Sequence, residues 1–509
     1  MPNVLYDALF APHQGSSRPF LHLEDGTVLS YGAFLELAAR IAHVLRDQGV
    51  EPGDRVAAQV KKSAEALALY AACIQAGSIF LPLNTAYTPN EVEYFVGNAE
   101  ARLVVCDEAA RAAIAPIAEK AGARLVTLNG DSSGTLTAEA ANQPNRFDTV
   151  SRGGDDLAAF LYTSGTTGRS KGAMLTQDNL LSNAKSLVEA WRFTKDDVLL
   201  HALPIFHTHG LFVAGNVSLL AGGSMIFLPS FKADQAIEWL PKATSMMGVP
   251  TFYTRLLDDP RFTKDLAAHM RLFTSGSAPL LAETHIAFDE RTGHRLLERY
   301  GMTETNMTTS NPYEGERRAG TVGFALPDVE IRVVDPETKK MLPDGEIGVL
   351  EVRGPNVFKG YWRMPEKTRE EFREDGFFIT GDVVTIDGDG YVQIVGRAKD
   401  LIISGGFNIY PKEVELLLDE QEGVLESAVI GLPHPDFGEG VVGVVVPKKG
   451  GIVEEEKLLA AIHDKIARFK QPKRIFAIDE LPRNTMGKVQ KQALRERFAD
   501  TFQNPVRDA

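Results

Sequence analysis

Short β-branched runs alternate with helix-like stretches over about the first 300 residues, and this alternation constrains the fold more than any other feature. Residues 101–128 and 196–229 show the pattern most clearly. Strands that alternate with helices form βαβ units, so the sequence predicts parallel sheets covered by helices. Ligand sites in such sheets lie in loops at the carboxyl ends of the strands. Functional residues are therefore expected directly after strands.

The pattern of strand-like and helix-like runs changes beyond residue 320. Residues 329–354 and 383–397 contain strand-like runs joined by Pro-Asp-Gly and Asp-Gly turns, which favour antiparallel hairpins. After Gly396 the pattern is a helix, two strands, a helix over 454–469 and a further strand. These elements predict a compact α+β unit of about 110 residues, an ordinary size for a domain.

Together these patterns predict an α/β fold. A large N-terminal domain would hold parallel βαβ sheets and an antiparallel β block, and a small C-terminal domain would be α+β. The predicted boundaries are 1–396 for the N-terminal domain, 397–400 for the junction, which the family resemblance given below implies to be the hinge of a mobile domain, and 401–509 for the C-terminal domain. The 509 residues are enough for several domains with cores of their own.

Charge and cysteine usage narrow the classes of partner and compartment. The chain has 54 basic and 68 acidic residues and a formal net charge of −14. A general binder of nucleic acid needs a basic surface, so nucleic acid is excluded as a partner, although a local cationic site for a small anion stays open. The two cysteines, Cys73 and Cys106, lie in apolar stretches and predict buried free thiols in a cytoplasmic protein.

The sequence also lacks the signals of membrane insertion and export. It contains no run of about 18 apolar residues, so no membrane span is predicted. The N-terminal stretch has an acid at Asp7 and no Lys or Arg before Arg18, which suits neither a secretory signal nor an Arg-rich transit peptide.

Residues 162–172 form the most informative loop, because they directly follow the apolar run LAAFLY. Glycines let backbone N–H groups approach an anion, hydroxyls donate further hydrogen bonds, and Lys171 supplies positive charge. The loop differs from a Walker A motif because Ser170 precedes the lysine and Gly172 follows it. We interpret it as a polyphosphate cradle; an ordinary surface loop is the alternative.

This loop resembles the signature phosphate loop of the adenylate-forming superfamily, which includes acyl-CoA synthetases, luciferases and peptide-synthetase adenylation domains. Further segments resemble the superfamily's other motifs and occur in the same order: Tyr300–Thr305, Thr380–Asp382, Arg397–Asp400, Ser404–Glu413 and Pro482–Lys488. The resemblance covers nearly the whole chain. It implies ATP, Mg²⁺ and coenzyme A as ligands, and a reaction that first forms an acyl-adenylate and then a thioester.

The resemblance assigns roles that agree with the chemistry of the side chains. Tyr300 would stack on adenine, Thr303 would contact the α-phosphate, and Glu304 would bind Mg²⁺ as a hard oxygen ligand. Asp382 and Arg397 would bind the ribose, which a carboxylate with two acceptor oxygens suits. Taken alone, the Tyr300 hexapeptide would be a capped helix start and Asp382 a turn residue.

Roles in the C-terminal part also follow from the resemblance. Lys488 would be the catalytic lysine that offsets negative charge in the transition state, and Lys399 would lie at the hinge. Ser404, Gly405 and Gly406 would line a tunnel for coenzyme A, a simple turn before the next helix being the alternative. Acylation of Lys488 by a lysine acyltransferase would remove its charge and silence the enzyme until a deacylase restored it.

Besides the tunnel and hinge residues, the expected site residues fall into four groups. Those expected to bind the nucleotide are Thr163, Ser164, Gly165, Thr166, Thr167, Gly168, Lys171, Ser277, Ala278, Arg299, Tyr300, Gly301, Thr303, Asp382, Arg397 and Lys488. The expected catalytic residues are Lys488, Thr303, Glu304 and His207, and the expected metal ligands are Thr163 and Glu304. The acyl substrate is expected to contact His207, Arg255, Ser277 and Met302.

The acid substrate is the least determined part of the reaction. In the superfamily the acyl site is built from segments that correspond here to those around His207, Thr251–Arg255 and Ser275–Ser277. Arg255 would place a guanidinium where it can pair with a second carboxylate. An arginine on the solvent face of a helix is the alternative, and for a single arginine it is the commoner case.

The segments HALPIFHTHGLF, GVPTFYTRLL, SGSAPLL, LERYGMTETNM, GPNVFKGYWRMPEKT and PRNTMGKVQK together resemble the malonyl-CoA synthetases. This likeness implies that the partners are small molecules, namely malonate, ATP and coenzyme A, with methylmalonate as a second substrate. Three alternatives stay open: a ligase for another small acid, an adenylation domain that loads a carrier protein, and a nucleotide-binding regulator without turnover.

Overall fold

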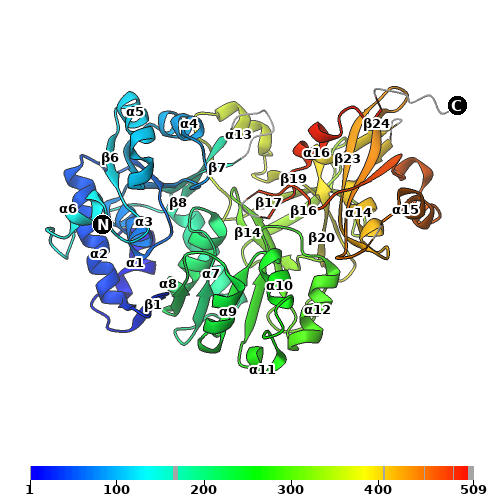
Figure 1. Ribbon diagram of the computed structural model, residues 1–509. Helices are drawn as coiled ribbons and strands as arrows, with labels where there is room; N and C mark the ends of the chain where they lie inside the picture. The colour runs from blue at the N-terminus through cyan, green and yellow to red at the C-terminus, as the bar shows by residue number, and fades with distance from the viewer. Residues whose placement is uncertain (1, 164–169, 405–406, 452, 485–486, 503–509) are drawn as a thin grey trace. The chain divides into compact units, whose positions relative to one another are not determined.

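The computed structural model describes residues 2–163, 170–404, 407–451, 453–484 and 487–502 (Figure 1). The chain divides into two compact units. Unit 1 holds the residues up to Gly276 together with Leu280–Glu330 and Val352–Phe378, and unit 2 holds Ser277–Pro279, Ile331–Glu351 and the residues from Ile379 onward.

The first sheet of unit 1 has seven strands within the described residues. In sheet order they are β18 (Gly360–Tyr361), β8 (Lys171–Thr176), β7 (Leu157–Thr163), β4 (Ile79–Pro82), β3 (Arg55–Gln59), β5 (Ala101–Cys106) and β6 (Arg124–Thr127). The strands from β7 to β6 pair in parallel, whereas β8 and β18 are antiparallel additions at one edge.

The second sheet of unit 1 has nine strands, counted over the described residues. In order they are β15 (Phe324–Ala325), β14 (Asn306–Ser310), β13 (Leu297–Met302), β12 (Leu272–Ser275), β11 (Ser245–Gly248), β9 (Val198–His201), β10 (Ser224–Phe227), β1 (Pro19–Leu23) and β2 (Val28–Ser30). Every pairing from β13 to β1 is parallel. The parallel sheets predicted from the sequence are therefore confirmed.

The helices of unit 1 connect these strands. They are α1 (Val4–Leu9), α2 (Tyr31–Asp47), α3 (Ala64–Ala76), α4 (Pro89–Ala99), α5 (Arg111–Ala121), α6 (Thr135–Ala140), α7 (Gln177–Ala190), α8 (Asn216–Ala221), α9 (Ala233–Trp239), α10 (Pro250–Leu257), α11 (Lys264–Ala267), α12 (Ala282–Thr292) and α13 (Pro365–Glu371). Helix α3 shows why they form where they do. The Ser63 side chain accepts a hydrogen bond from the Ala66 amide at its start, and Gly77 adopts a left-handed conformation after its end.

Two apolar cores of unit 1 are formed between these helices and the sheets. Phe95 of α4 and Ile114 of α5 pack with residues of the seven-stranded sheet such as Val104. On the nine-stranded sheet, α9, α10 and α12 lie side by side (Figure 1), and Tyr253 of α10 and Phe288 of α12 belong to one buried cluster. Helices that cover parallel strands leave the loops at the strand ends accessible for ligands.

Unit 2 holds two sheets. The first has the order β16 (Glu330–Val334), β17 (Gly348–Arg353), β19 (Phe378–Ile386) and β20 (Val392–Arg397). The second has the order β22 (Phe407–Ile409), β21 (Ile402–Ser404), β24 (Gly438–Pro447) and β23 (Val424–His434), with β25 (Arg474–Ala477) paired to β24. Its helices are α14 (Pro411–Asp419), α15 (Glu455–Ile462) and α16 (Lys491–Arg497).

The long hairpin of β23 and β24 is buried on both faces. Val429 and Val441 belong to a cluster that includes residues of α14 and α15, whereas Ile430 and Val442 belong to a cluster that includes Leu494 of α16. Successive residues of a strand point to opposite faces, so this hairpin forms the middle layer of a small α+β unit. The antiparallel block and the small C-terminal domain predicted from the sequence are both present.

One predicted helix is shorter than expected. The pattern over 454–469 predicts a continuous helix, but α15 ends at Ile462. The Gln471 side chain donates hydrogen bonds to the backbone carbonyls of His463 and Ile466, at 2.6 and 3.1 Å. Carbonyls that a longer helix would use internally are thus satisfied from outside it, which ends the helix early.

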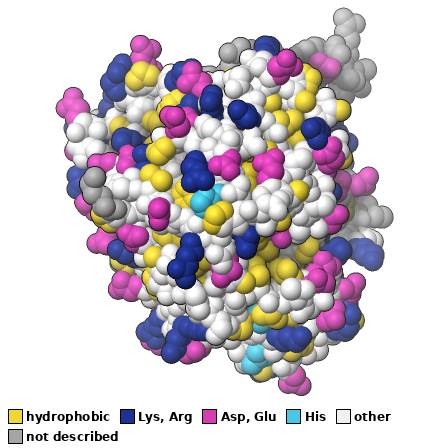
Figure 2. Space-filling view, turned by 90° about the vertical axis from the view of Figure 1, so that its left-hand side faces the viewer, with side chains coloured by type: hydrophobic (Ala, Val, Ile, Leu, Met, Phe, Trp, Pro, Cys, Tyr) yellow, Lys and Arg dark blue, Asp and Glu magenta, His cyan; other side chains and the backbone are white. Residues whose placement is uncertain are grey.

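The predicted boundary at 397–400 differs from the division by compactness, which groups the antiparallel block with unit 2. The hinge and the domain boundaries stay predictions. Cys73 and Cys106 are both free and buried, as the sequence predicts. None of the helices in the described residues combines the length and the apolar character needed to cross a bilayer. On the face shown in Figure 2, acidic and basic side chains are interspersed.

Candidate active site

The signature loop connects two antiparallel neighbours at the edge of the seven-stranded sheet. Thr163, the last residue of β7, lies opposite Lys171, the first residue of β8. Gly172 is required next to this pair, because a Cβ there would lie 2.2 Å from the ring of Phe160. Ser164, Gly165, Thr166, Thr167 and Gly168 lie outside the described residues. The structure thus shows both ends of the predicted cradle.

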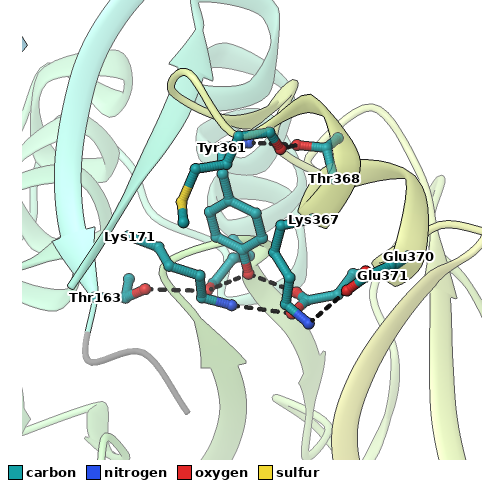
Figure 3. A network of polar contacts seen from close by, with 9 residues as sticks. Thr163, Lys171, Tyr361, Lys367, Thr368, Glu370 and Glu371 are labelled. Atoms are coloured by element: carbon teal, nitrogen blue, oxygen red, sulfur yellow. Dashed lines mark hydrogen bonds and ion pairs between the residues drawn. The ribbon is translucent and has the colours of Figure 1, made fainter. Parts of the chain in front are cut away.

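Lys171 is buried, with 6% of its surface exposed. Its ammonium Nζ lies 2.9 Å from Oε1 of Glu371 and 4.0 Å from the ring centre of Tyr361 (Figure 3). A carboxylate and the negative face of an aromatic ring both stabilise a buried cation. The predicted phosphate-binding lysine therefore has counter-charges of its own within unit 1.

Strand pairing explains why Tyr361 reaches Lys171. Tyr361 of β18 pairs with Ala173 of β8, and Ala173 is two residues from Lys171 on the same strand. Residues two apart on a strand point to the same face, and diagonal cross-strand neighbours are within reach of aromatic and long side chains. The backbone amide of Tyr361 also donates to Oγ1 of Thr368, at 2.9 Å, which ties α13 to this strand.

Glu304 lies between β13 and β14 and is 5% exposed. Its Oε1 accepts hydrogen bonds from the hydroxyls of Tyr361, at 3.0 Å, and Thr163, at 3.3 Å. These two donors are neutral, and no lysine or arginine pairs with Glu304 among the described residues. Mg²⁺ in nucleotide sites is held by one or two carboxylates together with phosphate oxygens. Glu304, with the Thr163 hydroxyl beside it, fits that donor set.

The hydroxyl of Tyr361 connects the two carboxylates. It lies 2.7 Å from Oε2 of Glu371 and 3.0 Å from Oε1 of Glu304. Burial and the charge of Glu304 raise the pKa of Tyr361 above its ordinary value, so the phenol stays protonated. Burial raises the pKa of Glu371, but hydrogen bonds from Tyr361 and Lys171 outweigh it and hold the pKa below its ordinary value.

Sequence reasoning missed Tyr361, Glu371 and Lys367, which complete this network. Lys367 is a second cation at Glu371, with its Nζ 3.1 Å from Oε1, and it also lies 3.2 Å from Oε2 of Glu370. The spacing of Lys367 from Glu370 and Glu371 on a helix is the signal that predicts these pairs. Nothing in the sequence shows that the cluster faces Lys171, because that contact spans 200 residues.

The segments expected to form the acyl site meet at one edge of the nine-stranded sheet. Strands β9, β11, β12 and β13 are parallel neighbours, so their carboxyl ends lie together. His207 follows β9 and is half-buried, and a π-helical segment begins two residues later at His209. Such segments are frequent at functional sites. Ser277 follows β12 and has a left-handed backbone, with φ of 70°, an uncommon conformation for a residue with a side chain.

Arg255 is on α10, the helix that follows β11, and its side chain is exposed. No ion pair to it is present among the described residues. This location agrees with the alternative interpretation, in which Arg255 lies on the solvent face of a helix. Its proposed pairing with a second carboxylate stays a prediction.

Arg299 of β13 is the more unusual arginine of this edge. It is 2% exposed, and its Nε and Nη2 have no hydrogen-bond partner among the described residues. Its guanidinium lies against Gly276, where a Cβ would be 2.4 Å from Cζ. Burial lowers the pKa of Arg299 below its ordinary value, although Tyr253 and Glu298 nearby oppose this. Burial and then the charge of Arg299 also hold the pKa of His209 far below its ordinary value.

The Tyr300–Thr305 motif surrounds the end of β13. Tyr300 is buried and Met302 and Thr303 are half-buried. Gly301 has no room for a side chain, because a Cβ there would lie 1.8 Å from the carbonyl oxygen of Asn306. The motif therefore turns tightly from β13 to β14 and carries Glu304 on that turn. The roles predicted for Tyr300 and Thr303 toward a nucleotide stay predictions, as do those of Ser277 and the half-buried Ala278.

In unit 2 the structure brings the two predicted ribose ligands together. Asp382 and Arg397 pair across β19 and β20, and Nε of Arg397 lies 2.6 Å from Oδ1 of Asp382. Asp382 is 2% exposed, and Thr380 accepts a hydrogen bond from its amide. The register of the hairpin thus places an acceptor and a donor side by side, as a diol site requires.

The remaining predicted residues of unit 2 lie on turns. Lys399 is in a helical turn, Ala398–Asp400, after β20. Ser404 is buried at the end of β21, and Gly405 and Gly406 lie outside the described residues. Lys488 is exposed, and its amide donates to Oδ1 of Asn484 at 3.0 Å.

Comparisons with known proteins agree with this arrangement. The family model described as "AMP-binding enzyme" matches residues 10–362, and the model "AMP-binding enzyme C-terminal domain" matches residues 413–488. A malonate–CoA ligase of Arabidopsis thaliana is 34% identical over 97% of this chain and 88% of its own length. A feruloyl-CoA synthase of an Amycolatopsis species is 35% identical over 96% of this chain and 97% of its own.

Among solved structures, ATP-bound MatB from Rhodopseudomonas palustris is 58% identical, with a TM-score of 0.97 over 99% of this chain and 100% of the other. The first family model alone covers more than half of the chain, and it includes the predicted phosphate loop, the Tyr300 motif and Tyr361. The chain belongs to the AMP-binding enzyme family.

Proposed function

We propose that this protein is an ATP-dependent, AMP-forming malonate–CoA ligase that takes methylmalonate as a second substrate. In the first step a carboxylate oxygen of the acid bonds to the α-phosphorus of ATP, and the bond to the β-phosphate breaks to release pyrophosphate. In the second step the sulfur of coenzyme A, after losing its proton, bonds to the acyl carbonyl carbon, and AMP leaves.

One observation in particular supports a dicarboxylic acid, namely the buried guanidinium of Arg299. A buried guanidinium whose Nε and Nη2 have no hydrogen-bond partner among the described residues is costly, and such a group is expected where an anionic ligand binds. Arg299 lies beside Gly276, at the edge where β9, β11, β12 and β13 end. One carboxylate of malonate would react at phosphorus, and the other would pair with this guanidinium. The similarity to a malonate–CoA ligase supports the same acid. A feruloyl-CoA synthase is about as similar to this chain, so the choice of malonate over an aromatic acid depends on the buried arginine.

Catalysis by these residues is mainly electrostatic. Two anions, the acid and ATP, must approach each other, so positive charge has to be supplied around the phosphates. Lys171 offers one such charge from the start of β8. Glu304 and Thr163 would hold Mg²⁺, which when bound neutralises phosphate charge and orients pyrophosphate as a leaving group. Holding both reactants in place supplies much of the remaining rate enhancement.

Residue roles that rest on the family resemblance complete the proposal. Lys488 is assigned to the adenylation step, Tyr300 to adenine, and Asp382 with Arg397 to the ribose. Ser404 and the two following glycines are assigned to the tunnel for coenzyme A, and the segment around Lys399 to the hinge of a mobile C-terminal domain. The close pairing of Asp382 and Arg397 supports the ribose assignment.

Two further parts of the proposal concern the cell. An acyltransferase that modified Lys488 would remove its charge and stop adenylation, and the exposure of this lysine supports such access. We also assign the protein to the cytoplasm, which its two buried free cysteines support.

The test is pyrophosphate release in the presence of ATP and Mg²⁺ over a panel of malonate, methylmalonate, succinate, butyrate and ferulate. We expect kcat/KM for malonate to exceed that for butyrate by about 100-fold or more, because a site built for a charged group rejects analogues that lack it. Higher activity with butyrate or ferulate would overturn the choice of malonate and leave the family assignment intact. Thioester formation with free coenzyme A, and none without it, is the second expected result.

A further inference from the structure

In the protein without nucleotide, the Lys171 ammonium already has two contacts. Its ammonium contacts the Glu371 carboxylate and the Tyr361 ring, yet the sequence motif places it where phosphate charge must be bound. A lysine cannot hold phosphate oxygens at full strength while its charge is neutralised at 2.9 Å. Binding of ATP must therefore change what Lys171 contacts.

The surrounding side chains make such a change inexpensive. Oε1 of Glu371 receives two ammonium groups at once, from Lys171 at 2.9 Å and from Lys367 at 3.1 Å. When Lys171 turns to another anion, Lys367 still neutralises Glu371. Figure 3 shows the two lysines approaching the same carboxylate from different elements, β8 and α13. The carboxylate is not left as an unpaired buried charge, which is the state that costs most.

Tyr361 adds a second exchange in the same cluster. A phenol has one hydrogen to donate, but this hydroxyl lies within hydrogen-bond distance of two carboxylates, Glu371 at 2.7 Å and Glu304 at 3.0 Å. Thr163 also donates to Glu304. A cation bound at Glu304 would replace the hydrogen bond from Tyr361, and the phenol would then donate to Glu371. This further compensates Glu371 for the loss of Lys171.

We propose that Glu371 is a built-in counter-ion that holds Lys171 in place without ATP and hands it to the phosphates of ATP when the nucleotide binds. Lys367 and the Tyr361 hydroxyl take over Glu371 at that point. Glu371, Lys367 and Tyr361 are thus positioning residues for the nucleotide. The proposal deepens the proposed function at its ATP site and does not depend on which acid is activated.

Two substitutions of Glu371 separate its charge from its geometry. Glu371→Gln keeps an oxygen that accepts from Lys171 and removes the competing negative charge. We expect it to bind a non-hydrolysable ATP analogue about fivefold more tightly in calorimetry. Glu371→Ala removes the acceptor as well, so Lys171 loses its position and kcat for pyrophosphate release falls about tenfold or more.

Lys367→Met tests the exchange from the other side. Among the described residues, Lys171 is then the one ammonium left on Glu371. Releasing it costs more, so the ATP analogue should bind about two- to fivefold more weakly. Glu370→Gln is the matched control, because Glu370 is an exposed neighbour on α13 that contacts Lys367. It should leave both the dissociation constant and kcat within about twofold of the parent values.

All measurements use the full chain, and thermal unfolding confirms that each variant is folded. A Glu371→Gln variant that binds the analogue as the parent does, or more weakly, overturns the proposal. So does a Lys367→Met variant with tighter binding. Inactivity of the parent protein toward malonate would leave these binding results unaffected, so failure of the proposed acid and failure of this inference are distinguishable.

Discussion

Lys171 and Arg299 are two buried cations of unit 1 that differ in the groups that contact them. Lys171 has a carboxylate at 2.9 Å and an aromatic ring at 4.0 Å. Arg299 is buried at least as deeply, but its Nε and Nη2 have no hydrogen-bond partner within the described part of the chain. Both lie in segments that the sequence assigns to substrate binding. The difference is whether a carboxylate of the protein is in hydrogen-bond contact with the cation, as at Lys171, or whether nitrogens of the cation lack acceptors among the described residues, as at Arg299.

The contacts of each cation affect how its substrate binds. A cation with a resident carboxylate must exchange partners on binding, which lowers affinity but leaves a satisfied site when the ligand is absent. A cation without one is destabilising in the free protein and gains most when its ligand arrives. Nucleotide binding is therefore expected to be moderated by the protein's own charges, and acid binding to be selective for a second negative charge.

Arg299→Met removes the buried guanidinium and is expected to have the largest effect. The variant should lower kcat/KM for malonate by about 100- to 1,000-fold, because the second carboxylate loses its paired charge. The value for butyrate should change by less than about tenfold. Steady-state pyrophosphate release with both acids measures the split.

Stability separates this role from a structural one. Replacing an unpaired buried charge by an apolar side chain of similar length is neutral or stabilising, so the melting temperature of Arg299→Met should not fall. A lower melting temperature with equal losses for both acids would contradict the assignment. Arg255→Leu is the parallel variant, since Arg255 is exposed on α10. The arginine whose loss hurts malonate more is the one that binds its second carboxylate.

Gly276→Ala tests the position of the Arg299 guanidinium, because it moves this group and keeps its charge. The added Cβ would lie 2.4 Å from Cζ of Arg299, so the guanidinium must shift. We expect kcat/KM for malonate to fall about tenfold and stability to fall by about 1–3 kcal/mol. In the Arg299→Met background the methyl group meets a thinner side chain, so its additional cost should shrink. Equal costs in both backgrounds would show that Arg299 is not what the methyl group displaces.

The sequence predicts the parts of this molecule that depend on local pattern. Alternating strands and helices predict the parallel sheets, and the loop before Lys171 predicts a phosphate site. The motifs assign Asp382 and Arg397 to the same ribose, and the structure pairs these two side chains. The helix predicted over 454–469 ends at Ile462 because the side chain of Gln471 satisfies nearby carbonyls, a tertiary contact that no helical pattern contains.

The charges that decide the site are the least predictable from sequence. Glu371 meets Lys171 only because β18 is added beside β8, and the helix that carries Glu371 follows that strand. Arg299 was expected among the nucleotide ligands by its position beside Tyr300. Adjacent residues of a strand face opposite sides, and the side chain of Arg299 lies against Gly276. Counter-ions are set by packing between distant segments, so a motif identifies the cation and not its partner.

The smallest effect is expected in unit 2, where the same contrast occurs between two carboxylates of α14. Glu415 lies 2.6 Å from the ammonium of Lys491, and although burial opposes this, the charges of Lys491 and Lys412 lower its pKa. Asp419 has its nearest ammonium, that of Lys412, at 3.9 Å. Burial raises the pKa of Asp419 to about 6, with Lys412 only partly opposing it. One carboxylate has its counter-ion in contact, and the other does not.

The sign of the pH dependence follows from these directions. Folded Asp419 binds its proton more tightly than the unfolded chain does, so between pH 3.8 and about 6 stability falls as pH rises. At pH 7 the ionised Asp419 is a cost. Asp419→Asn should therefore raise the free energy of unfolding at pH 7 and leave it unchanged below pH 3.8, as measured by urea unfolding across this range. Glu415→Gln should do the opposite and destabilise the protein at pH 7, because it leaves Lys491 without its contact carboxylate. If both variants shift stability in the same direction, proximity of the counter-ion does not decide the sign, and the contrast between Lys171 and Arg299 loses its physical basis.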